Sequence, residues 1–493
     1  MNLATAFALS AEKNSTKTAL FWGEHEYSYG RLLDQSRWLA QQLRRDFNVQ
    51  PGDRVGIWLR NCPEYVPALF GVLEAGAVVA PINNFLKPDE VSYILADGGI
   101  DVLITDSAMA ESLPALAAAR PSLRFLHVEQ IALAQPVSPD DFTPAPRRES
   151  DLAVILYTSG TTGRPKGAML SHGNLLHNVE SCRQVLQAVS FDRFVVLLPM
   201  FHSFMLCVGI LLPLIIGGSI VLVKSLHPPK SILHEIVARQ ATLLPAIPQL
   251  FRALANAPIP PNLPLRLCVS GAAPLPVEVL REFNAKYPLP LLEGYGLSEA
   301  SPVVSINPIQ GPWKEGSIGK PIPDVEVSVQ NEAGEHLPDG AIGEICVRGG
   351  NVMLGYWNQP EETAKVLRHG WLLTGDVGYR DADGYYFITD RKKDMLLVNG
   401  INVYPRELEE VIYQFPGVKE AAVVGVPDPR KGEHPVAFVV ANDGVAIDER
   451  ALLHFVRGKV ADYKVPRRVH FLASLPRNAT GKILKTELRQ RLR

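Results

Sequence analysis

The sequence of 493 residues contains little cysteine, and its five thiols are widely spaced. None belongs to a CxxC pair or a Cys/His cluster, which excludes a disulfide framework and gives no sign of structural zinc. An excess of one charge is also missing, since 49 Lys and Arg residues oppose 51 Asp and Glu residues. This balance argues against broad binding of nucleic acid. We expect reduced, buried thiols in a cytoplasmic protein at Cys62, Cys182, Cys207, Cys268 and Cys346.

Signals for export or for a membrane span are missing too. The first residues contain no basic region followed by an apolar run long enough for a signal peptide. Residues 204–223 carry no charge and are long enough to span a bilayer, but Pro213 and the pair Gly217–Gly218 interrupt them. We therefore predict a buried helix followed by a buried strand in this segment.

The length favours about two to four domains or subdomains. Up to residue 130, helical patterns such as 31–47 alternate with strand-like segments, which predicts a parallel sheet with helices on its faces. A second such series begins at the apolar segment 152–158 and continues to about residue 305. Residues 311–390 contain short strands between turn residues and predict a small antiparallel sheet or barrel. The last hundred residues predict a compact α+β domain, so the fold class is α/β with β and α+β additions.

The strongest local signal is residues 157–168, YTSGTTGRPKGA, which follow the predicted strand 152–158. Gly, Ser and Thr permit a tight loop whose N–H groups and hydroxyls can surround phosphate oxygens, and Lys166 adds a cation. The Walker A template fails, because Pro165 stands at its second glycine and Gly167 at its Ser or Thr. We therefore predict a nucleotide loop other than a P-loop. Its candidate contacts are Thr158, Ser159, Gly160, Thr161, Thr162 and Gly163.

Further segments resemble motifs of the adenylate-forming superfamily, which includes acyl-CoA synthetases, peptide-synthetase adenylation domains and beetle luciferases. They occur in the family's order over essentially the whole chain, and three of them look most like bacterial long-chain fatty acid–CoA ligases. The segments are PMFHSF (199–204), SGAAPLP (270–276), EGYGLSE (293–299), GEICVRG (343–349), GWLLTGD (370–376), DRKKDMLLVNGINVYPRELEE (390–410) and PRNATGK (476–482). The resemblance implies a large N-terminal domain over 1–390, a hinge at 391–394 and a small mobile C-terminal domain over 395–493.

An enzyme of this kind activates a carboxylic acid in two steps. The carboxylate attacks the α-phosphorus of ATP to give an acyl adenylate and pyrophosphate, and a thiol then displaces AMP. The first step brings an anion against the charges of ATP, so it needs metal, cations and positioned N–H groups. The resemblance implies ATP and CoA as substrates, and Mg²⁺ held by Glu299, since one carboxylate and several waters suffice for that ion.

The resemblance also assigns the nucleotide contacts. Asp376 would accept hydrogen bonds from the ribose hydroxyls, with Arg391 supporting the ribose and phosphates. Tyr295 would border the adenine, and Ser298 would contact the α-phosphate. The other residues of the expected nucleotide site are Gly271, Ala272 and Gly296.

Lys482 is expected to act in one of the two steps only. By resemblance, the C-terminal domain rotates about Lys393, so that Lys482 reaches the reacting carboxylate during adenylation and then withdraws. In the second orientation Gly400 would line the path of the thiol. Together with Lys482, the expected catalytic residues are Lys166, Glu299 and His202.

The segment PMFHSFM is expected to line the acyl pocket. His202 would lie at the entrance beside the carboxylate, and we do not assign it as a general base. Met205 stands where the family often has glycine, so its thioether would narrow the pocket. The other expected pocket residues are Phe201, Phe204 and Leu297.

We interpret the chain as an ATP-dependent fatty acid–CoA ligase for medium to long chains. An aryl acid stays open, because pocket residues are scattered over the fold, and so does a carrier-protein thiol in place of CoA. A non-catalytic nucleotide or acyl binder is disfavoured by the intact set of motif residues, and nothing requires luciferase-like oxidation. We expect no nucleic acid partner. Peripheral membrane association stays open because the substrates partition into lipid, and so does a homodimer.

Overall fold

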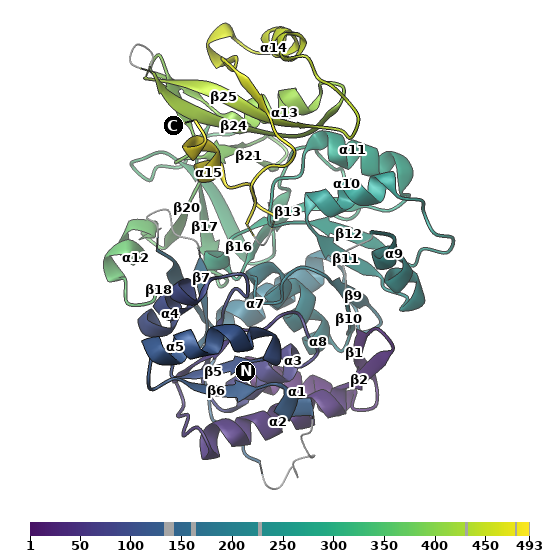
Figure 1. The fold of residues 1–493 in the computed structure, drawn as a ribbon, viewed down its shortest axis with the longest axis vertical. Coiled ribbons are helices and arrows are strands. Elements are labelled where there is room, and N and C mark those ends of the chain that lie inside the picture. The colour runs from purple at the N-terminus through teal and green to yellow at the C-terminus, as the bar shows by residue number, and fades with distance from the viewer. Residues whose placement is uncertain (133–141, 159–163, 225–228, 429–431, 479–480, 493) are drawn as a thin grey trace.

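Strands form four sheets in the part of the chain that the computed structural model describes (Figure 1). Two large sheets with their helices fill the lower and middle part of the view, and the last hundred residues form its top. This is the α/β fold with a smaller antiparallel sheet and a C-terminal α+β part that the sequence predicts, and the prediction is confirmed. The described residues are 1–132, 142–158, 164–224, 229–428, 432–478 and 481–492.

The first large sheet has seven strands in the order β18-β8-β7-β4-β3-β5-β6. Its central strands run parallel, as the alternating pattern predicts, whereas β8 returns antiparallel beside β7. The predicted phosphate loop therefore connects two antiparallel strands. The strands are β3 (Arg54–Ile57), β4 (Val78–Pro81), β5 (Val102–Thr105), β6 (Arg124–His127), β7 (Leu152–Thr158), β8 (Lys166–Ser171) and β18 (Gly355–Tyr356).

The second large sheet has nine strands in the order β15-β14-β13-β12-β11-β9-β10-β1-β2. Six of its strands, β13 through β1, pair in parallel, and the edge strands are antiparallel. The strands are β1 (Thr18–Trp22), β2 (His25–Ser28), β9 (Arg193–Val196), β10 (Ser219–Leu222), β11 (Leu243–Ala246), β12 (Leu267–Ser270), β13 (Leu291–Gly296), β14 (Val303–Ile306) and β15 (Lys320–Pro321).

Helices connect and cover these sheets, and several begin at a capping residue. Ser28 accepts the N–H of Arg31 at the start of α2, and Ser171 with Asn174 forms a capping box at the start of α7. The helices are α1 (Leu3–Lys13), α2 (Tyr29–Arg45), α3 (Tyr65–Glu74), α4 (Pro88–Asp97), α5 (Leu113–Ala119), α6 (Glu129–Ala132), α7 (His172–Val185), α8 (Leu212–Ile216), α9 (Pro229–Ala238), α10 (Pro248–Asn256) and α11 (Val277–Lys286).

The charge-free segment 204–223 folds as predicted. A wide helical stretch, Met205–Leu211, continues into α8, and β10 follows as a buried strand. All seven residues of Met205–Leu211 are buried, and all except Gly209 belong to the main hydrophobic core. No helix among the described residues is both long and apolar enough to cross a membrane.

The predicted small antiparallel sheet follows the second large sheet. Its strands pair in the order β16-β17-β20-β19, and β21 also pairs with β20, further along that strand than β19. This sheet matters for the site, because β20 and β21 lie between the large sheets and the C-terminal part (Figure 1). Its elements are β16 (Val325–Gln330), β17 (Gly343–Gly349), β19 (Leu367–Arg368), β20 (Trp371–Arg380), β21 (Tyr386–Arg391) and the adjacent helix α12 (Pro360–Val366).

The C-terminal part has its own sheet with an apolar cluster on each face. Along β24, Val423 packs in one cluster and Val424 in the other, because successive strand residues point to opposite faces. The elements are β22 (Leu396–Val398), β23 (Ile401–Val403), β24 (Val418–Asp428), β25 (Gly432–Ala441), β26 (Val469–Phe471), α13 (Pro405–Tyr413), α14 (Glu449–Arg457) and α15 (Lys485–Gln490).

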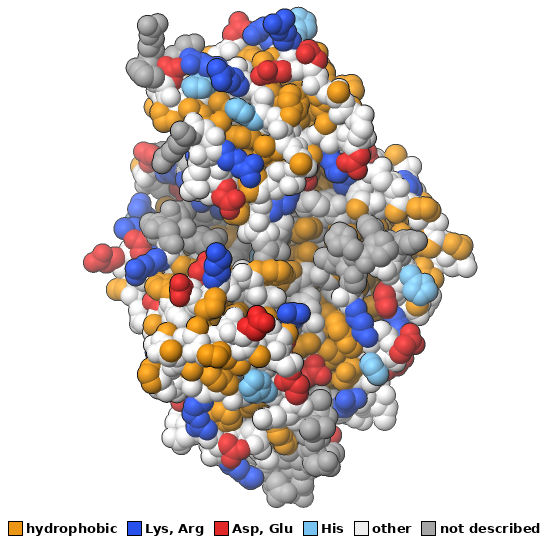
Figure 2. Space-filling model, in the orientation of Figure 1, with side chains coloured by type: hydrophobic (Ala, Val, Ile, Leu, Met, Phe, Trp, Pro, Cys, Tyr) orange, Lys and Arg blue, Asp and Glu red, His pale blue; other side chains and the backbone are white. Residues whose placement is uncertain are grey.

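The surface agrees with the balanced composition. On the face drawn in Figure 2, Lys and Arg side chains are interspersed with Asp and Glu side chains. A broad basic surface of the kind that attracts nucleic acid is not visible on this face among the described residues.

Candidate active site

Asp376 is the centre of a cluster of side chains from three strands. It lies on β20 opposite Arg391 of β21, and its carboxylate is almost fully buried. The hydroxyl of Tyr295, on β13, donates a 2.6 Å hydrogen bond to Asp376 Oδ2, and Arg391 Nε lies 3.0 Å from Oδ1. Burial and the neighbouring carboxylate raise the pKa of Tyr295, so its hydroxyl remains a donor. Three nucleotide-site candidates from three separate motifs therefore lie together.

Lys482 approaches this cluster from the C-terminal segment. Its backbone N–H donates to the side chain of Asn478 at 2.9 Å, and Gly481 beside it lies against Ile247, just before α10. Burial, and after it the charge of Arg391, lowers the pKa of Lys482 to about 8, whereas the charge of Asp376 acts in the opposite direction. The ammonium group of Lys482 therefore interacts electrostatically with both Asp376 and Arg391.

Lys166 and Glu299, the candidates for the phosphates and the metal, are linked by Tyr356, a residue outside the motifs, and Lys166 also contacts a second such residue, Glu362. Lys166, on β8, forms an ion pair with Glu362 of α12. Its Nζ also lies 5.1 Å from the ring centre of Tyr356, on β18. The hydroxyl of Tyr356 donates a 2.9 Å hydrogen bond to Glu299 Oε1. Lys166 and Glu299 are therefore held on two sides of one tyrosine.

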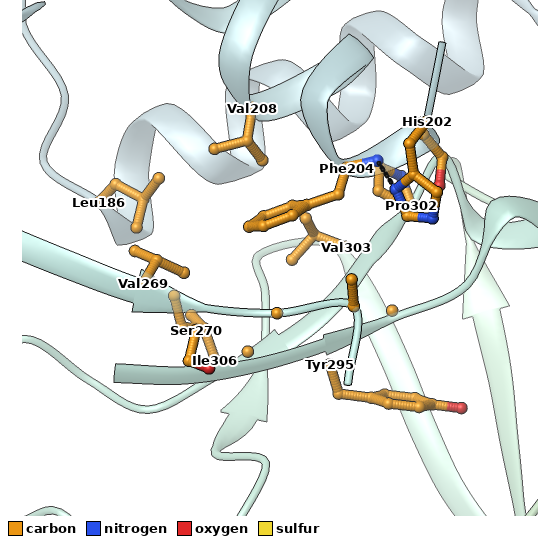
Figure 3. A pocket seen from close by; sticks show the side chains of 15 residues that line it. Leu186, His202, Phe204, Val208, Val269, Ser270, Tyr295, Pro302, Val303 and Ile306 are labelled. Carbon is orange, nitrogen blue, oxygen red and sulfur yellow. Dashed lines mark hydrogen bonds between the residues drawn. The ribbon is translucent and has the colours of Figure 1, made fainter. Parts of the chain in front are cut away.

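An apolar pocket opens beside Tyr295. It encloses about 520 Å³ of empty space, which includes its open mouth. Figure 3 shows Phe204 reaching into the pocket, with Leu186 and Val269 at the end away from His202 and Tyr295. Gly296 forms part of the wall, and a Cβ there would lie 2.2 Å from the carbonyl oxygen of Pro302, so this position requires glycine. The lining residues are Leu186, His202, Ser203, Phe204, Val208, Val269, Ser270, Gly271, Ala272, Gly294, Tyr295, Gly296, Pro302, Val303 and Ile306.

The expected acyl-pocket residues separate into two groups. His202 and Phe204 line the pocket, whereas Phe201, Met205 and Leu297 are not among its lining residues. Phe201 packs edge-on against Phe85, with ring centres 6.5 Å apart, and Met205 is fully buried in the helical stretch. Leu297 is partly buried, and its N–H donates to Pro302.

His202 is neutral at physiological pH. Burial lowers the pKa of its imidazole to about 4, and its Nδ1 accepts the N–H of Phe204 at 3.3 Å. Beside it, the hydroxyl of Ser298 donates to that of Ser203 at 3.1 Å. The residues expected near the reacting carboxylate and α-phosphate thus lie at the same end of the pocket.

Comparisons with known proteins agree with this geometry. The family model described as AMP-binding enzyme matches residues 7–357, and the model of the AMP-binding enzyme C-terminal domain matches residues 407–482. The chain belongs to the AMP-binding enzyme family. These are the adenylate-forming enzymes that the sequence motifs resemble.

Two curated relatives of this AMP-binding enzyme cover nearly its whole length. A feruloyl-CoA synthase of Amycolatopsis is 40% identical over 478 residues, which is 96% of each chain. A long-chain-fatty-acid–CoA ligase of Bacillus subtilis is 36% identical over 530 residues, covering 97% of this chain and 92% of the relative. The chain is an AMP-forming acid–CoA ligase, with ATP and CoA as its substrates.

The arrangement of this AMP-binding enzyme is that of a nucleotide-bound relative. The structure of ATP-bound MatB from Rhodopseudomonas palustris matches it with a TM-score of 0.92 at 34% identity, covering 100% of this chain and 99% of the other. The apo structure of the same protein gives a TM-score of 0.80 over the same shares. The structure thus resembles the ATP-bound form of MatB more than its apo form.

A magnesium site would fit the residues present. Among the described residues, no group of three or more His, Cys, Asp and Glu side chains gathers that could hold a metal by itself. Mg²⁺ needs no such group, because it commonly binds one or two carboxylates together with substrate phosphates and waters. Glu299 is one such carboxylate, and Tyr356 orients it.

The phosphate loop is only partly described. Ser159, Gly160, Thr161, Thr162 and Gly163 lie outside the described residues, so their phosphate contacts stay predictions. Thr158 ends β7, and its hydroxyl donates to the carbonyl oxygen of Lys166 at 3.4 Å, which ties the strands on either side of the loop together.

The expected hinge is a turn between β21 and β22. The N–H of Lys392 donates to Gly375 at 2.8 Å and that of Met395 to Arg391 at 3.0 Å, with Lys393 between them. Burial and the charge of Arg391 lower the pKa of Lys393. Rotation about Lys393, and the domain boundaries at 390 and 395, stay predictions.

Contacts beyond the hinge hold the C-terminal part in this orientation. Arg406 of α13 lies 3.7 Å from Glu293 of β13, and burial raises the pKa of Glu293 to about 7. The N–H of Val277 donates to Glu410 at 3.4 Å. Arg252 of α10 donates to the carbonyl oxygen of Val418 at 3.1 Å.

Sequence reasoning missed Tyr356 and Glu362. Both lie in the segment NVMLGYWNQPEET, 351–363, and the only local signal there is Pro360 followed by acidic residues, which is typical of a helix start. Their place in the site follows from β18 pairing with β8, where Tyr356 lies opposite Ala168. No pattern near Tyr356 indicates that pairing.

Proposed function

We propose that this AMP-binding enzyme activates an apolar monocarboxylic acid as its acyl adenylate, with Mg²⁺, and then transfers the acyl group to CoA. One observation carries the proposal: Tyr295 lines the apolar pocket and also binds Asp376, beside Lys482. An acid in the pocket and a nucleotide bound to Asp376 would therefore both lie next to Tyr295.

Each side chain has a separate task in adenylation. Asp376, held by two donors, accepts hydrogen bonds from the ribose hydroxyls. Lys482 supplies positive charge where charge develops between carboxylate and α-phosphate. Neutral His202 borders the carboxylate and does not act as a general base, because the attacking carboxylate is already ionised. When bound, Mg²⁺ would neutralise part of the phosphate charge, and Glu299 is the carboxylate that would hold it.

The second step needs a different arrangement of the C-terminal part. Lys482 is close enough to Asp376 and Arg391 in this orientation for their charges to shift its pKa, and we expect it to withdraw before CoA enters. Gly400 lies in the β22–β23 turn with φ +77°, and no atom lies within 4 Å of the place of a Cβ there. Rotation about Lys393 would bring this open turn to the thiol path.

The first candidate for the acid is a fatty acid of medium to long chain. The deep part of the pocket is built from aliphatic side chains, and none of the 15 lining residues carries Lys, Arg, Asp or Glu. Such walls favour an apolar tail and disfavour a second carboxylate. Fatty acid metabolism in the cytoplasm would be its setting. Peripheral membrane contact or a homodimer would leave this chemistry unchanged.

An aryl acid is the second candidate. The observation that favours it is the 40% identity to a feruloyl-CoA synthase over 96% of the chain. Leu186 and Val269 also close the far end of the pocket, which suits a compact ring (Figure 3).

The decisive experiment measures pyrophosphate release and thioester formation with purified protein, ATP and Mg²⁺. Straight-chain acids from acetate to oleate, benzoates and ferulate are compared, each with CoA, with a carrier-protein thiol and with neither. We expect acid-dependent pyrophosphate release and CoA thioesters, with the highest kcat/KM for a fatty acid. The highest value for ferulate would select the aryl candidate, and no pyrophosphate release with any acid would refute the proposal.

Leu186→Ala should shift the preference towards longer acids. The substitution removes most of a buried side chain at the end of the pocket, so the chain length with the highest kcat/KM should rise by about two to four carbons. The KM for ATP should stay unchanged. Leu175→Ala is the matched control, because Leu175 is buried on the neighbouring helix α7 but does not line the pocket. An identical chain-length profile in both variants would contradict the assigned end of the pocket.

Gly400→Leu should slow thioester formation by about tenfold or more while leaving pyrophosphate release within about twofold. A leucine at this open turn obstructs nothing in the present orientation, but it would narrow the thiol path in the other. Gly444→Leu is the control, since Gly444 has the same φ of +77° and equally open surroundings in the same domain. Equal rates of CoA transfer in the two variants would remove Gly400 from the thiol path.

A further inference from the structure

Glu362 forms an ion pair with Lys166, the cation that is expected to bind the phosphates of ATP. Its carboxylate forms an ion pair with Lys166, whose side chain is only 12% exposed, whereas that of Glu362 is 28% exposed. The aromatic ring of Tyr356 lies on another side of the same ammonium group. In the structure, Lys166 therefore already has an anionic partner.

The segment 353–363, which contains Glu362, also makes contacts that hold Glu299. The N–H of Tyr356 donates a 2.8 Å hydrogen bond to the hydroxyl oxygen of Thr363, which fixes α12 to β18. The N–H of Met353 donates to the carbonyl oxygen of Glu299 at 2.9 Å, and the Tyr356 hydroxyl donates to its carboxylate. The carboxylate of Glu362 is thus placed beside Lys166 by contacts that fix α12 to β18 and the segment before β18 to Glu299.

A second cation can keep Glu362 paired when Lys166 leaves it. Lys365, one turn further along α12, also forms an ion pair with Glu362, and its side chain is 64% exposed. The hydrogen bonds of Lys166 and then of Lys365 lower the pKa of Glu362 to about 2, so it is ionised throughout the physiological range. When Lys166 moves from the carboxylate of Glu362 to a phosphate, Glu362 therefore stays paired with Lys365, and Lys166 is paired with the phosphate.

We infer that Glu362 is an internal stand-in for pyrophosphate: it holds Lys166 before ATP binds, yields it to the triphosphate, and takes it back as pyrophosphate leaves. This inference rests on the proposed function. No covalent bond changes in this exchange, since Lys166 only moves between two anions. The competing carboxylate weakens the hold on pyrophosphate and so favours its departure after adenylation.

The test is pyrophosphate binding by Glu362→Gln, measured by calorimetry without Mg²⁺ and without an acid. We expect the variant to bind pyrophosphate about threefold to fivefold more tightly than the wild type, because a partly exposed ion pair no longer competes. Glu361→Gln is the matched control: it removes the same charge from the same helical turn, but its side chain is exposed and Lys166 pairs with Glu362 instead. This control should bind pyrophosphate like the wild type.

A second pair of variants identifies Lys166 as the group that is exchanged. In a Lys166→Ala background, Glu362→Gln should leave pyrophosphate affinity unchanged. Unchanged or weaker binding by Glu362→Gln alone, or equal tightening by Glu361→Gln, would overturn the inference. Acid-dependent pyrophosphate release by the wild type is measured separately, and its absence would refute the proposed function instead.

Discussion

Lys482→Ala should lower the rate of acyl-adenylate formation by about two to three orders of magnitude, as removal of one preorganised electrostatic group does in other sites. The same variant should convert a supplied acyl adenylate and CoA into thioester at close to the wild-type rate, because Lys482 is expected to withdraw before that step. Pyrophosphate release measures the first reaction and thioester formation the second. The split between the two half-reactions is the result that a loss of folding would not produce.

Lys464→Ala is the control for this variant. Lys464 lies in the same C-terminal part, where it pairs with Glu407 at 2.7 Å. Its removal should leave both half-reactions within about twofold, since a partly exposed ion pair contributes little to stability. If Lys482→Ala lowers the rates of adenylation and thioester formation equally, Lys482 does not act in adenylation alone.

The low pKa of Lys482 gives adenylation a pH dependence of definite sign. The charged form is the active one, and burial lowers its pKa to about 8, so it predominates below that pH and disappears above it. The kcat/KM for ATP, which reports the free enzyme, should therefore fall as the pH rises through about 8. Lys482→Arg keeps its charge, so this fall should be absent from the residual activity of that variant. If kcat/KM for ATP still falls above about pH 8 in Lys482→Arg, another titrating group is responsible for the fall.

Asp376→Asn should raise the KM for ATP by about 10-fold to 100-fold. The substitution keeps the shape of the side chain but removes the anion that we propose accepts hydrogen bonds from the ribose, and hydrogen bonds to charged groups are worth about 1.5–3 kcal/mol. It also weakens the contacts that orient Tyr295 and Arg391. The KM for the acid should change less, because Asp376 does not line the pocket.

Asp192→Asn is the matched control for stability. Both aspartates are 3% exposed as whole residues and pair with arginine, Asp192 with Arg266 at 2.7 Å. Both substitutions should destabilise the fold, since each leaves an arginine without its partner. Thermal unfolding records that shared effect. If the KM for ATP is the same in the two variants, Asp376 does not contact the ribose.

Much of the fold follows from local patterns in the sequence. The segment 204–223 is an instructive case, because Gly217 and Gly218 separate the helical residues from the strand β10 as predicted, whereas Pro213 lies inside α8 and does not end the helix. The wide helical turns of Met205–Leu211 were not predictable, since apolar periodicity does not distinguish them from ordinary helix. The antiparallel return of β8 beside β7 depends on strand pairing, which local patterns do not report.

The candidate site divides in the same way. Motifs named Tyr295, Asp376 and Arg391 as nucleotide residues, but they did not indicate that the tyrosine hydroxyl binds the carboxylate. Likewise, Lys166 was named from its loop, whereas its partner Glu362 comes from a helix far along the chain. Of the expected acyl-pocket residues, only His202 and Phe204 line the pocket that the fold forms.

The sequence by itself determined the class of fold, the adenylate-forming family and the residue types of the site, because these depend on periodicity and on motifs of consecutive residues. Only the tertiary structure decided which side chains meet: Tyr295 with Asp376, Tyr356 with Glu299, and Glu362 with Lys166. The physical reason is that each of these contacts joins separate strands and helices. Their distances are set by sheet order and core packing, which no short stretch of the chain encodes.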